Sequence, residues 1–526
     1  MNQFELLLVL LSVCVVLAAV AQRLRLPVAV MLVLGGMGVA FIPGLPRLEI
    51  DPALVMALFL PPLLQLSAYH TDWPAFRTHL RAILLLAIGA VFFTAALVAV
   101  ATKLLVPELP WWAAITLGAI VAPPDAVAAS SILKQFKLPA RIVTVLEGES
   151  LINDASSLVL YKFAVAAVGI GTVSYSAGLF QFFVVALGGT AIGWIVGRAA
   201  MRVFSLIDDT LLDITVNLLA GFAAYLGAEA LHVSGVLAAV ACGFVLGRQQ
   251  HAEFSARTRL ELVTVWGFIE FILTSLVFVL IGLQLRGISE RLVHYDTRQL
   301  VLLAVVVSTI LIAGRFAWVF PATWLPRALS PALRERDPLP PWSHATVISW
   351  TGMRGVVSLA AALALPDDFP GRDLILFLAF CAIFVTLVVQ GTSLGWVIRR
   401  LGLADYEPLP EPETGHARAE MAMAALGAVR QHLDTEAGSG GEQAEAAAEL
   451  VQEYEVRAER ASIEGQDVET KAAELEAQQR LRIVAIEAAR QALDEQADEL
   501  DVETYRSLGQ ELDLEEQQVR RALDQE

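Results

Sequence analysis

The chain has 526 residues, of which 56% are hydrophobic and only 17% are charged, whereas soluble domains carry about 25% charged residues. Residues 405–526 hold 31 acidic and 11 basic residues, which leaves 23 of the 54 acidic and 26 of the 37 basic residues for residues 1–404. A long segment this apolar and nearly neutral excludes a soluble enzyme, a nucleic-acid-binding protein and a disulfide-stapled secreted domain.

Residues 1–404 contain apolar runs that are long enough to cross a lipid bilayer. A hydrocarbon core about 30 Å thick needs about 20 apolar residues in a helix. We expect about thirteen spans, at 4–20, 28–42, 53–69, 80–102, 111–133, 142–169, 178–200, 211–231, 233–247, 262–285, 299–321, 342–365 and 373–398. The sequence therefore predicts an all-α polytopic membrane protein.

The basic residues predict the orientation of these spans, because Lys and Arg concentrate in cytoplasmic loops. The first span has no basic residue before it and is followed by Arg23 and Arg25, so it does not read as a signal peptide. With the N-terminus outside, loops expected inside carry 17 basic residues and loops expected outside carry 6. Thirteen spans then leave the acidic tail in the cytoplasm.

Few charged residues fall within the spans, and a charge at that depth usually has a function. The basic residues there are Lys162, Arg315 and Arg354. The acidic residues are Asp125, Glu149, Asp154 and Glu270, with Glu147 and Asp213 nearer the cytoplasmic ends.

Two spans contain helix-breaking residues at matching positions. The fifth span carries Pro123 and Pro124, which remove backbone donors, and the twelfth carries Gly352 and Gly355. If the seventh span connects two halves of six spans, the fifth span and the twelfth span are each the fifth of their half. The two halves then have opposite orientations in the membrane. Paired interrupted helices in inverted halves indicate a transporter site. The alternative is an ordinary proline kink, with the glycines used only for packing.

The sixth span carries polar residues along one side of its helix. Residues spaced by i, i+4, i+7 and i+11 share a stripe, and here they are Ser150, Asp154, Ser157 and Tyr161. The neighbouring stripe holds Glu149, Asn153 and Ser156. Such stripes on an apolar span face protein or water rather than lipid.

Asp125, Asp154 and Arg354 all fall near the middle of their spans, within about one helical turn of the bilayer midplane. Desolvation and mutual repulsion push buried carboxylates toward the neutral form, unless an ion pair, a proton or a small cation neutralises them. A carboxylate that takes a proton or a cation, but not both, makes the two compete, and this competition is an exchange mechanism. Oxygen ligands suit a hard monovalent ion.

These segments resemble the monovalent cation/proton antiporters of the cation:proton antiporter-1 family, the bacterial sodium/proton exchangers. The matching segments are FLPPLLQLSAY (59–69), APPDAVAA (122–129), GESLINDASS (148–157), GRFAWVFP (314–321) and GMRGVVSLAAAL (352–363). The resemblance covers about residues 1–400 and leaves the tail unaccounted for. GESLIND together with GMRG is a specific signal, whereas FLPP alone would be weak.

The resemblance implies that Asp154 alternately binds the cation and the proton, and that Asp125 is either a second cation ligand or a cap on the half-helix dipoles. Ser150 would supply a hydroxyl ligand, with a helix-packing serine as the alternative. Asn153 would orient the site, and an asparagine before the essential aspartate is associated with electroneutral exchange.

The resemblance also implies a structural ion pair between Glu149 and Arg354. Arg315 would satisfy half-helix carbonyls or extend toward the interface, and we expect Lys162 to reach the interface. The sequence departs from the family pattern at Pro124 and Ala126, where many members have Thr and Pro. The coordination number and the ion preference therefore stay open.

The expected architecture has two parts. The transmembrane exchanger domain, residues 1–404, would contain a mobile core (about 80–169 and 299–398) and a dimer scaffold (about 4–69 and 178–285). Residues 405–526 would form an acidic helical cytoplasmic tail that is regulatory or supports a dimer, or is solvated and partly disordered.

The predicted function is electroneutral Na+/H+ antiport by alternating access in a bacterial inner membrane, with no enzymatic activity, cofactor or nucleic-acid partner. The expected partners are monovalent cations, protons, membrane lipid and a second copy of the chain. The alternatives are exchange that prefers K+ or includes Li+, Na+-coupled solute symport, and a channel, which would need no protonatable exchange site.

Overall fold

The computed structural model describes residues 3–24, 26–42, 52–133, 135–136, 138–170, 175–207, 209–292 and 296–404, with parts of the tail at 420–421, 423–428, 430–431, 451, 468–495, 508, 512, 514–517 and 519–520. The chain divides into two compact units, Met1–Tyr406 and Glu407–Glu526.

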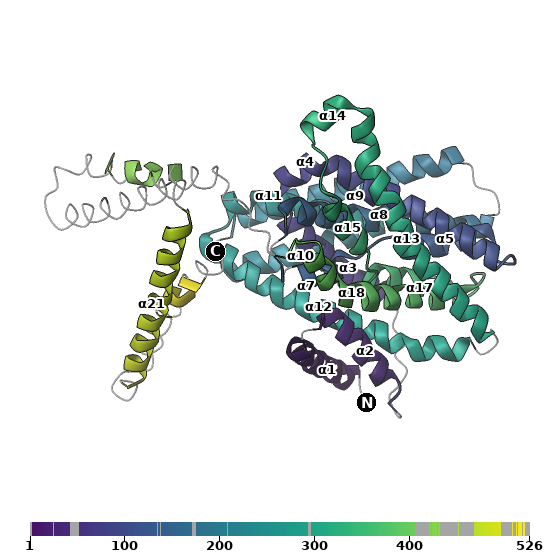
Figure 1. The fold of residues 1–526 in the computed structure, drawn as a ribbon, viewed down its shortest axis with the longest axis horizontal. Coiled ribbons are helices and arrows are strands. Elements are labelled where there is room, and N and C mark those ends of the chain that lie inside the picture. The colour runs from purple at the N-terminus through teal and green to yellow at the C-terminus, as the bar shows by residue number, and fades with distance from the viewer. Residues whose placement is uncertain are drawn as a thin grey trace. The chain divides into compact units, whose positions relative to one another are not determined.

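The first unit is built from helices, and its described residues contain no strand (Figure 1). Its helices are α1 (Gln3–Leu24), α2 (Val28–Ala40), α3 (Pro52–His70), α4 (Trp73–Leu84), α5 (Val91–Leu105), α6 (Trp111–Val121), α7 (Ala126–Leu133), α8 (Ala140–Ile170), α9 (Tyr175–Phe204), α10 (Thr210–Ala230), α11 (Gly235–Glu253), α12 (Ala256–Arg291), α13 (Thr297–Leu329), α14 (Pro331–Arg336), α15 (Trp342–Trp350), α16 (Val356–Leu363), α17 (Arg372–Val385) and α18 (Gly391–Arg400). Two π-helical segments, η1 (Leu85–Ala90) and η2 (Thr386–Gln390), join α4 to α5 and α17 to α18.

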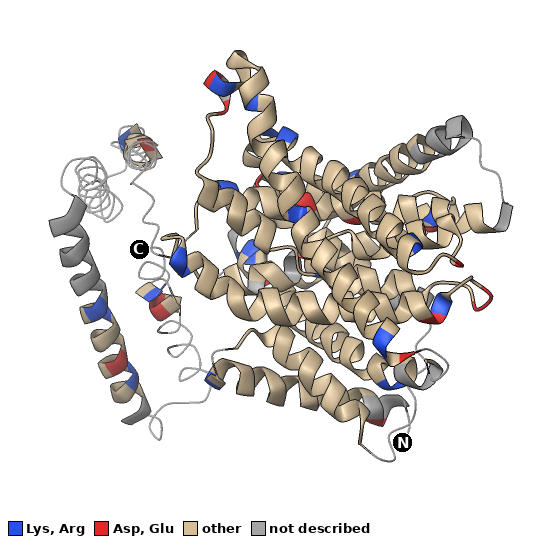
Figure 2. Cartoon of the chain, turned by 45° about the vertical axis from the view of Figure 1, so that its right-hand side comes forward, with Lys and Arg blue, Asp and Glu red and all other residues tan. Residues whose placement is uncertain are grey.

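Among the described residues, eight helical segments are long and apolar enough to cross a membrane, and α2 and α6 are shorter apolar helices. Figure 2 shows that charged residues are sparse along these helices. The all-α class predicted from the sequence is confirmed. The count of thirteen spans stays a prediction, because the halves of the interrupted spans are each shorter than a bilayer is thick.

Glycines allow some of these helices to pack with their backbones close together, as is common in membrane proteins. A Cβ added at Gly36 of α2 would lie 2.4 Å from the Val279 carbonyl oxygen of α12, and one added at Gly282 would lie 2.3 Å from that of Val33. The α2–α12 interface therefore depends on residues without side chains.

The interrupted helices start from local signals that the sequence makes plain. Pro110 and Pro341 immediately precede α6 and α15, and a proline before a helix does not remove a needed intrahelical donor. The chain leaves helical geometry after Val121 and after Trp350 and resumes it at Ala126 and Val356. Both breaks therefore fall at the proline and glycine segments predicted from the sequence.

In the tail, α21 covers Val468–Glu495. Glu516 accepts a hydrogen bond from Arg520 at 2.7 Å and lies 2.8 Å from Arg490, and these contacts hold the pKa of the Glu516 carboxyl below its usual value.

Of the loop residues used to predict orientation, Arg25, Arg47, Lys134 and Lys137 lie outside the described residues.

Candidate functional site

The two helix breaks lie against each other. The backbone N–H of Asp125, which precedes α7, donates to the Met353 carbonyl between α15 and α16 at 2.7 Å. Non-helical backbone within a membrane is tolerated only where protein or a cavity surrounds it, and a direct bond between the two breaks meets part of that need. The crossing brings residues 231 positions apart into one site.

Asp125 lies at the start of two half-helices. It directly precedes α7, and its Oδ2 accepts a hydrogen bond from the N–H of Val356, the first residue of α16, at 3.3 Å. Helix N-termini carry partial positive charge, so a carboxylate is stabilised there. A Cβ added at Gly355 would lie only 1.6 Å from Asp125 Oδ2, so this approach requires glycine.

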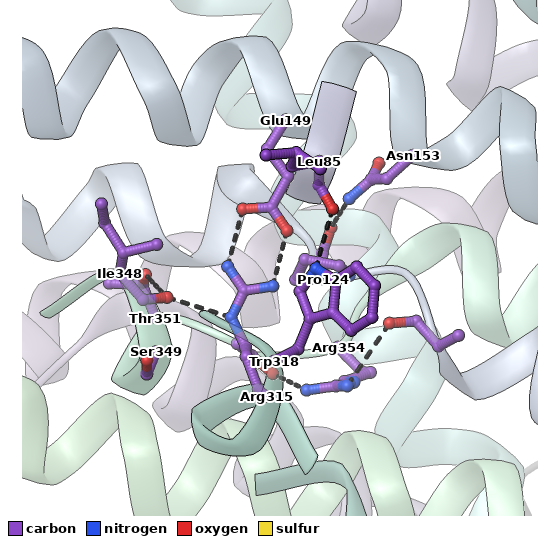
Figure 3. Close-up of polar contacts among 12 residues, drawn as sticks. Leu85, Pro124, Glu149, Asn153, Arg315, Trp318, Ile348, Ser349, Thr351 and Arg354 are labelled. Atoms are coloured by element: carbon purple, nitrogen blue, oxygen red, sulfur yellow. Dashed lines mark hydrogen bonds and ion pairs between the residues drawn. The ribbon is translucent and has the colours of Figure 1, made fainter. Parts of the chain in front are cut away.

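Arg354 is 1% exposed and donates to backbone carbonyls (Figure 3). Its Nε donates to the Val121 carbonyl at 2.9 Å, and its other donors reach the carbonyls of Ala122 at 3.4 Å and of Gly352. The carbonyls of Val121 and Ala122 end α6, where the helix dipole is negative. The guanidinium thus satisfies the carboxyl-terminal end of one interrupted helix.

Glu149 pairs with Arg315 rather than with Arg354. The two guanidinium nitrogens of Arg315 donate to the two carboxylate oxygens of Glu149 at 2.5 and 2.7 Å, and the side chains are 3% and 1% exposed (Figure 3). Arg315 Nε also donates to the Ile348 carbonyl near the end of α15 at 3.0 Å.

The predicted Glu149–Arg354 pair is therefore wrong, while Arg315 has the predicted contact with a half-helix carbonyl. The reason is positional. Arg315 comes from α13, which packs on α15, and its planar fork matches a carboxylate with two parallel bonds. Arg354 is instead directed at the open end of α6, where carbonyl oxygens take its donors.

A cavity of about 140 Å³ brings several predicted site residues together. Its polar lining comes from α3, α7, α8 and α12 and from the first break: Ser67, His70, Asp125, Ser130, Glu147, Ser150, Asp154 and Glu270. Asp154 is 7% exposed. One water molecule needs a cavity volume of about 10–15 Å³, so this cavity can hold a cation with several of its waters.

Asn153 lies next to this cavity without lining it. Its Nδ2 donates to the Pro124 carbonyl at 2.9 Å, which ties α8 to the first break, and its Oδ1 is buried without a hydrogen-bond partner in the described residues (Figure 3).

Lys162 lies away from the cavity, is 55% exposed and forms an ion pair with Glu229 at 3.2 Å.

Ser130 belongs to the cavity and sequence reasoning missed it, although its place in the half-helix after a break was a usable signal. Glu270 was identified as an intramembrane acid without a known role, and it lines this cavity from α12. No sequence pattern could bring Glu270 to the cavity, because α12 is distant in the chain from α8 and its position is set by tertiary packing, for example on α2 and α3.

The chemistry of the cavity suits a hard monovalent cation. Several carboxylates and hydroxyls line one space, among them those of Asp125, Asp154, Ser130 and Ser150. Oxygen ligands of this kind are preferred by hard ions rather than by soft transition metals.

Comparisons with known proteins identify the family to which this chain is similar. The family model for the sodium/hydrogen exchanger transmembrane domain matches residues 8–400. An uncharacterized Na+/H+ exchanger of Mycobacterium bovis is 34% identical over 535 residues, which cover 98% of this chain and 96% of the relative. A sodium, potassium, lithium and rubidium/H+ antiporter of Bacillus pumilus is 32% identical over 73% of this chain and 61% of its own length.

A solved structure shares the fold. The sodium proton antiporter MjNhaP1 from Methanocaldococcus jannaschii, at pH 8, superposes with a TM-score of 0.60 at 17% identity, covering 76% of this chain and 98% of its own. The segment matched by the family model, residues 8–400, ends just before the acidic tail. The alignment with the Mycobacterium bovis relative covers 98% of this chain and therefore includes nearly all of the tail. The resemblance predicted from the sequence is confirmed, and the chain belongs to the sodium/hydrogen exchanger family.

Proposed function

We propose that this membrane protein exchanges Na+ for H+, one cation per proton, and that the Asp154 carboxylate binds each in turn. One observation carries this proposal. Asp154 is 7% exposed and lines the cavity, yet within the described part of the chain its carboxylate forms no ion pair and no hydrogen bond.

The two buried arginines nearby are already engaged. Arg315 is held by Glu149 and the Ile348 carbonyl, and Arg354 is held by carbonyls at the end of α6. An ionised carboxylate in a largely buried site without a counter-charge is costly, so it holds a proton or attracts a cation. Because either one neutralises the same charge, binding of one releases the other, and this coupling makes antiport.

The remaining cavity residues have supporting roles in this proposal. The hydroxyls of Ser150 and Ser130 complete the cation's coordination together with water. Asp125 acts mainly as the cap of α7 and α16, because the Val356 N–H already donates to it, and its negative charge adds to the attraction for cations. With Asn153 beside Asp154, a single carboxylate exchanges its ligand in each cycle, which gives electroneutral exchange.

The proposed architecture has thirteen spans in two inverted halves, with the N-terminus outside and the tail in the cytoplasm of a bacterial inner membrane. The matched starts of α6 and α15 after Pro110 and Pro341, and their matched breaks, support the repeat. Packing supports a mobile core and a scaffold: α5, α6, α8, α13 and α15 pack among themselves, as do α3, α9, α10 and α11.

The scaffold would form a homodimer, and the protein would serve pH homeostasis. K+ and Li+ are alternative cations, since the Bacillus pumilus relative carries both in its name. A solute symporter is less well supported, because a cavity of about 140 Å³ leaves little room for an organic substrate beside a hydrated cation.

Purified protein in liposomes with a trapped pH dye tests the proposal. Pulses of Na+ should move protons, and Asp154→Asn should abolish that movement. The control is Asp213→Asn, because Asp213 is similarly buried (8% exposed) but does not line the cavity. Proton movement that survives in Asp154→Asn, or a Na+ current without proton movement in the native protein, would reject the proposal.

A further inference from the structure

A second cavity lies among α4, α8, α13 and α15 and shares no lining residue with the Asp154 cavity. It has a volume of about 40 Å³, and Arg81, Arg141, Arg327 and His344 provide its charged or titratable lining. Three arginines from three different helices therefore converge on one small space. We refer to it as the arginine pocket.

One carboxylate faces these three arginines. Asp337 lies 2.9 Å from Arg141 and 3.8 Å from Arg81, and it also forms an ion pair with Arg327. Three guanidinium groups against one carboxylate leave an excess of two positive charges at the pocket. In a partly buried site, such an excess favours the binding of an anion.

The donors of the pocket are unevenly satisfied. Arg327 is 3% exposed and all three of its nitrogens donate, to Thr323 and to Asp337. Arg81 makes no hydrogen bond to the described residues, and its buried Nε has no partner. Among the residues that the structure describes, the buried Nδ1 of His344 likewise has no hydrogen-bond partner. Buried polar atoms of this kind are normally satisfied, so the unmet groups point to a ligand.

We propose that the arginine pocket binds a phosphate group, carried by an anionic phospholipid headgroup or by a soluble phosphate. The planar fork of arginine matches phosphate oxygens with paired bonds. A cavity of about 40 Å³ has room for about three groups the size of water, so it admits some of the four oxygens of one phosphate.

The location favours contact with a membrane surface. Arg81, Arg141 and Arg327 belong to loops and helix ends that the charge bias assigns to the cytoplasmic side, where anionic lipids attract basic residues. This part of the inference rests on the proposed orientation. The pocket also contacts α8, α13 and α15, which carry Asp154, Arg315 and the second helix break. A bound phosphate would tie together the ends of helices that form the exchange site.

The competing explanation is that Asp337 is the only anion the cluster needs and that it fastens the segment between α14 and α15. The Asp337→Asn variant separates the two explanations. It removes the competing carboxylate and raises the positive charge of the pocket. Phosphate should then bind more tightly and should restore thermal stability lost by the substitution, whereas a simple fastening role predicts a loss of stability that phosphate does not restore.

The binding experiment uses the full-length protein in two arms. In the first, delipidated protein in a neutral detergent is titrated with inorganic phosphate, and binding is followed by calorimetry and by the melting temperature. In the second, native mass spectrometry measures retention of phosphatidylglycerol against phosphatidylcholine after purification. The variants are Arg81→Gln and Arg141→Gln, and the control is Arg202→Gln, an exposed arginine in the last turn of α9.

Each pocket variant should weaken binding about tenfold or more, while Arg202→Gln and the native protein should bind alike. Selective retention of phosphatidylglycerol that the pocket variants lose identifies a lipid headgroup, and phosphate binding without such retention identifies a soluble phosphate. Binding that is equal in the native protein and in both pocket variants, or absent in both arms, overturns the proposal. Exchange by the Asp154 site can persist in either case, so the two proposals fail separately.

Discussion

Replacing Glu149 by glutamine would leave Arg315 buried without its counter-charge. The native pair has two parallel bonds of 2.5 and 2.7 Å between side chains that are 1% and 3% exposed, so water cannot replace the lost carboxylate. Breaking a buried pair by removing one partner costs about 3–5 kcal/mol. We expect Glu149→Gln to lower the free energy of unfolding by that amount.

The magnitude is best tested by double-mutant cycles, which measure the coupling between two side chains. Unfolding of Glu149→Gln, Arg315→Gln, Arg354→Gln and the paired variants would be followed in mixed detergent micelles by helical circular dichroism. The Glu149–Arg315 coupling should be about 2 kcal/mol or more, and larger than the Glu149–Arg354 coupling. A larger coupling with Arg354 would refute the assignment of partners made from the structure.

Two glycine substitutions give further tests. Gly355→Ala places a Cβ 1.6 Å from Asp125 Oδ2, so it should displace the carboxylate and lower the exchange rate at least about tenfold in the liposome assay. An unchanged rate would contradict the close approach. Gly36→Ala places a Cβ 2.4 Å from a carbonyl of α12 and should destabilise the protein by about 1–3 kcal/mol. Gly38→Ala, on the same helix with nothing within 4 Å, is the matched control and should have little effect; equal melting temperatures for the two variants would contradict the packing argument.

The helix breaks and the residue at the centre of the site were predictable from the sequence. Pro123 and Pro124 remove backbone donors and so favour a break near Asp125. The pair Pro61 and Pro62 lies within α3 without ending it, so prolines alone do not decide where a helix breaks. The polar stripe that contains Ser150 and Asp154 follows from helical periodicity. The structure brings these three polar residues, Asp125, Ser150 and Asp154, to one cavity.

The choice of ion-pair partners was not predictable. Arg315 and Arg354 both lie within apolar spans, and either could reach Glu149 as far as the sequence reveals. The rotation of α13 about its axis and the direction of the second break decide between them, and both depend on tertiary packing. The same reason explains why the sequence assigns no role to Glu270, which lines the cavity from α12.

The π-helical segments η1 and η2 were also not expected. Their composition, as in Leu85–Ala90 and Thr386–Gln390, matches that of the flanking α-helices, so no local signal marks them. Thr386 of η2 accepts a hydrogen bond from the backbone N–H of Arg354 at 3.1 Å. A π-helical turn commonly lies at a functional position, and this contact places η2 beside the second break.

Proton release upon cation binding tests the shared carboxylate most directly. Na+ would be added to the detergent-solubilised protein in a weakly buffered solution with a pH indicator, while calorimetry records how much Na+ binds. We predict that the native protein releases about one proton for each Na+ bound at a pH below the midpoint of its titration and about half a proton at the midpoint, and that Asp154→Asn releases none. Na+ binding without proton release in the native protein, or undiminished release in Asp154→Asn, would contradict competition for a single side chain.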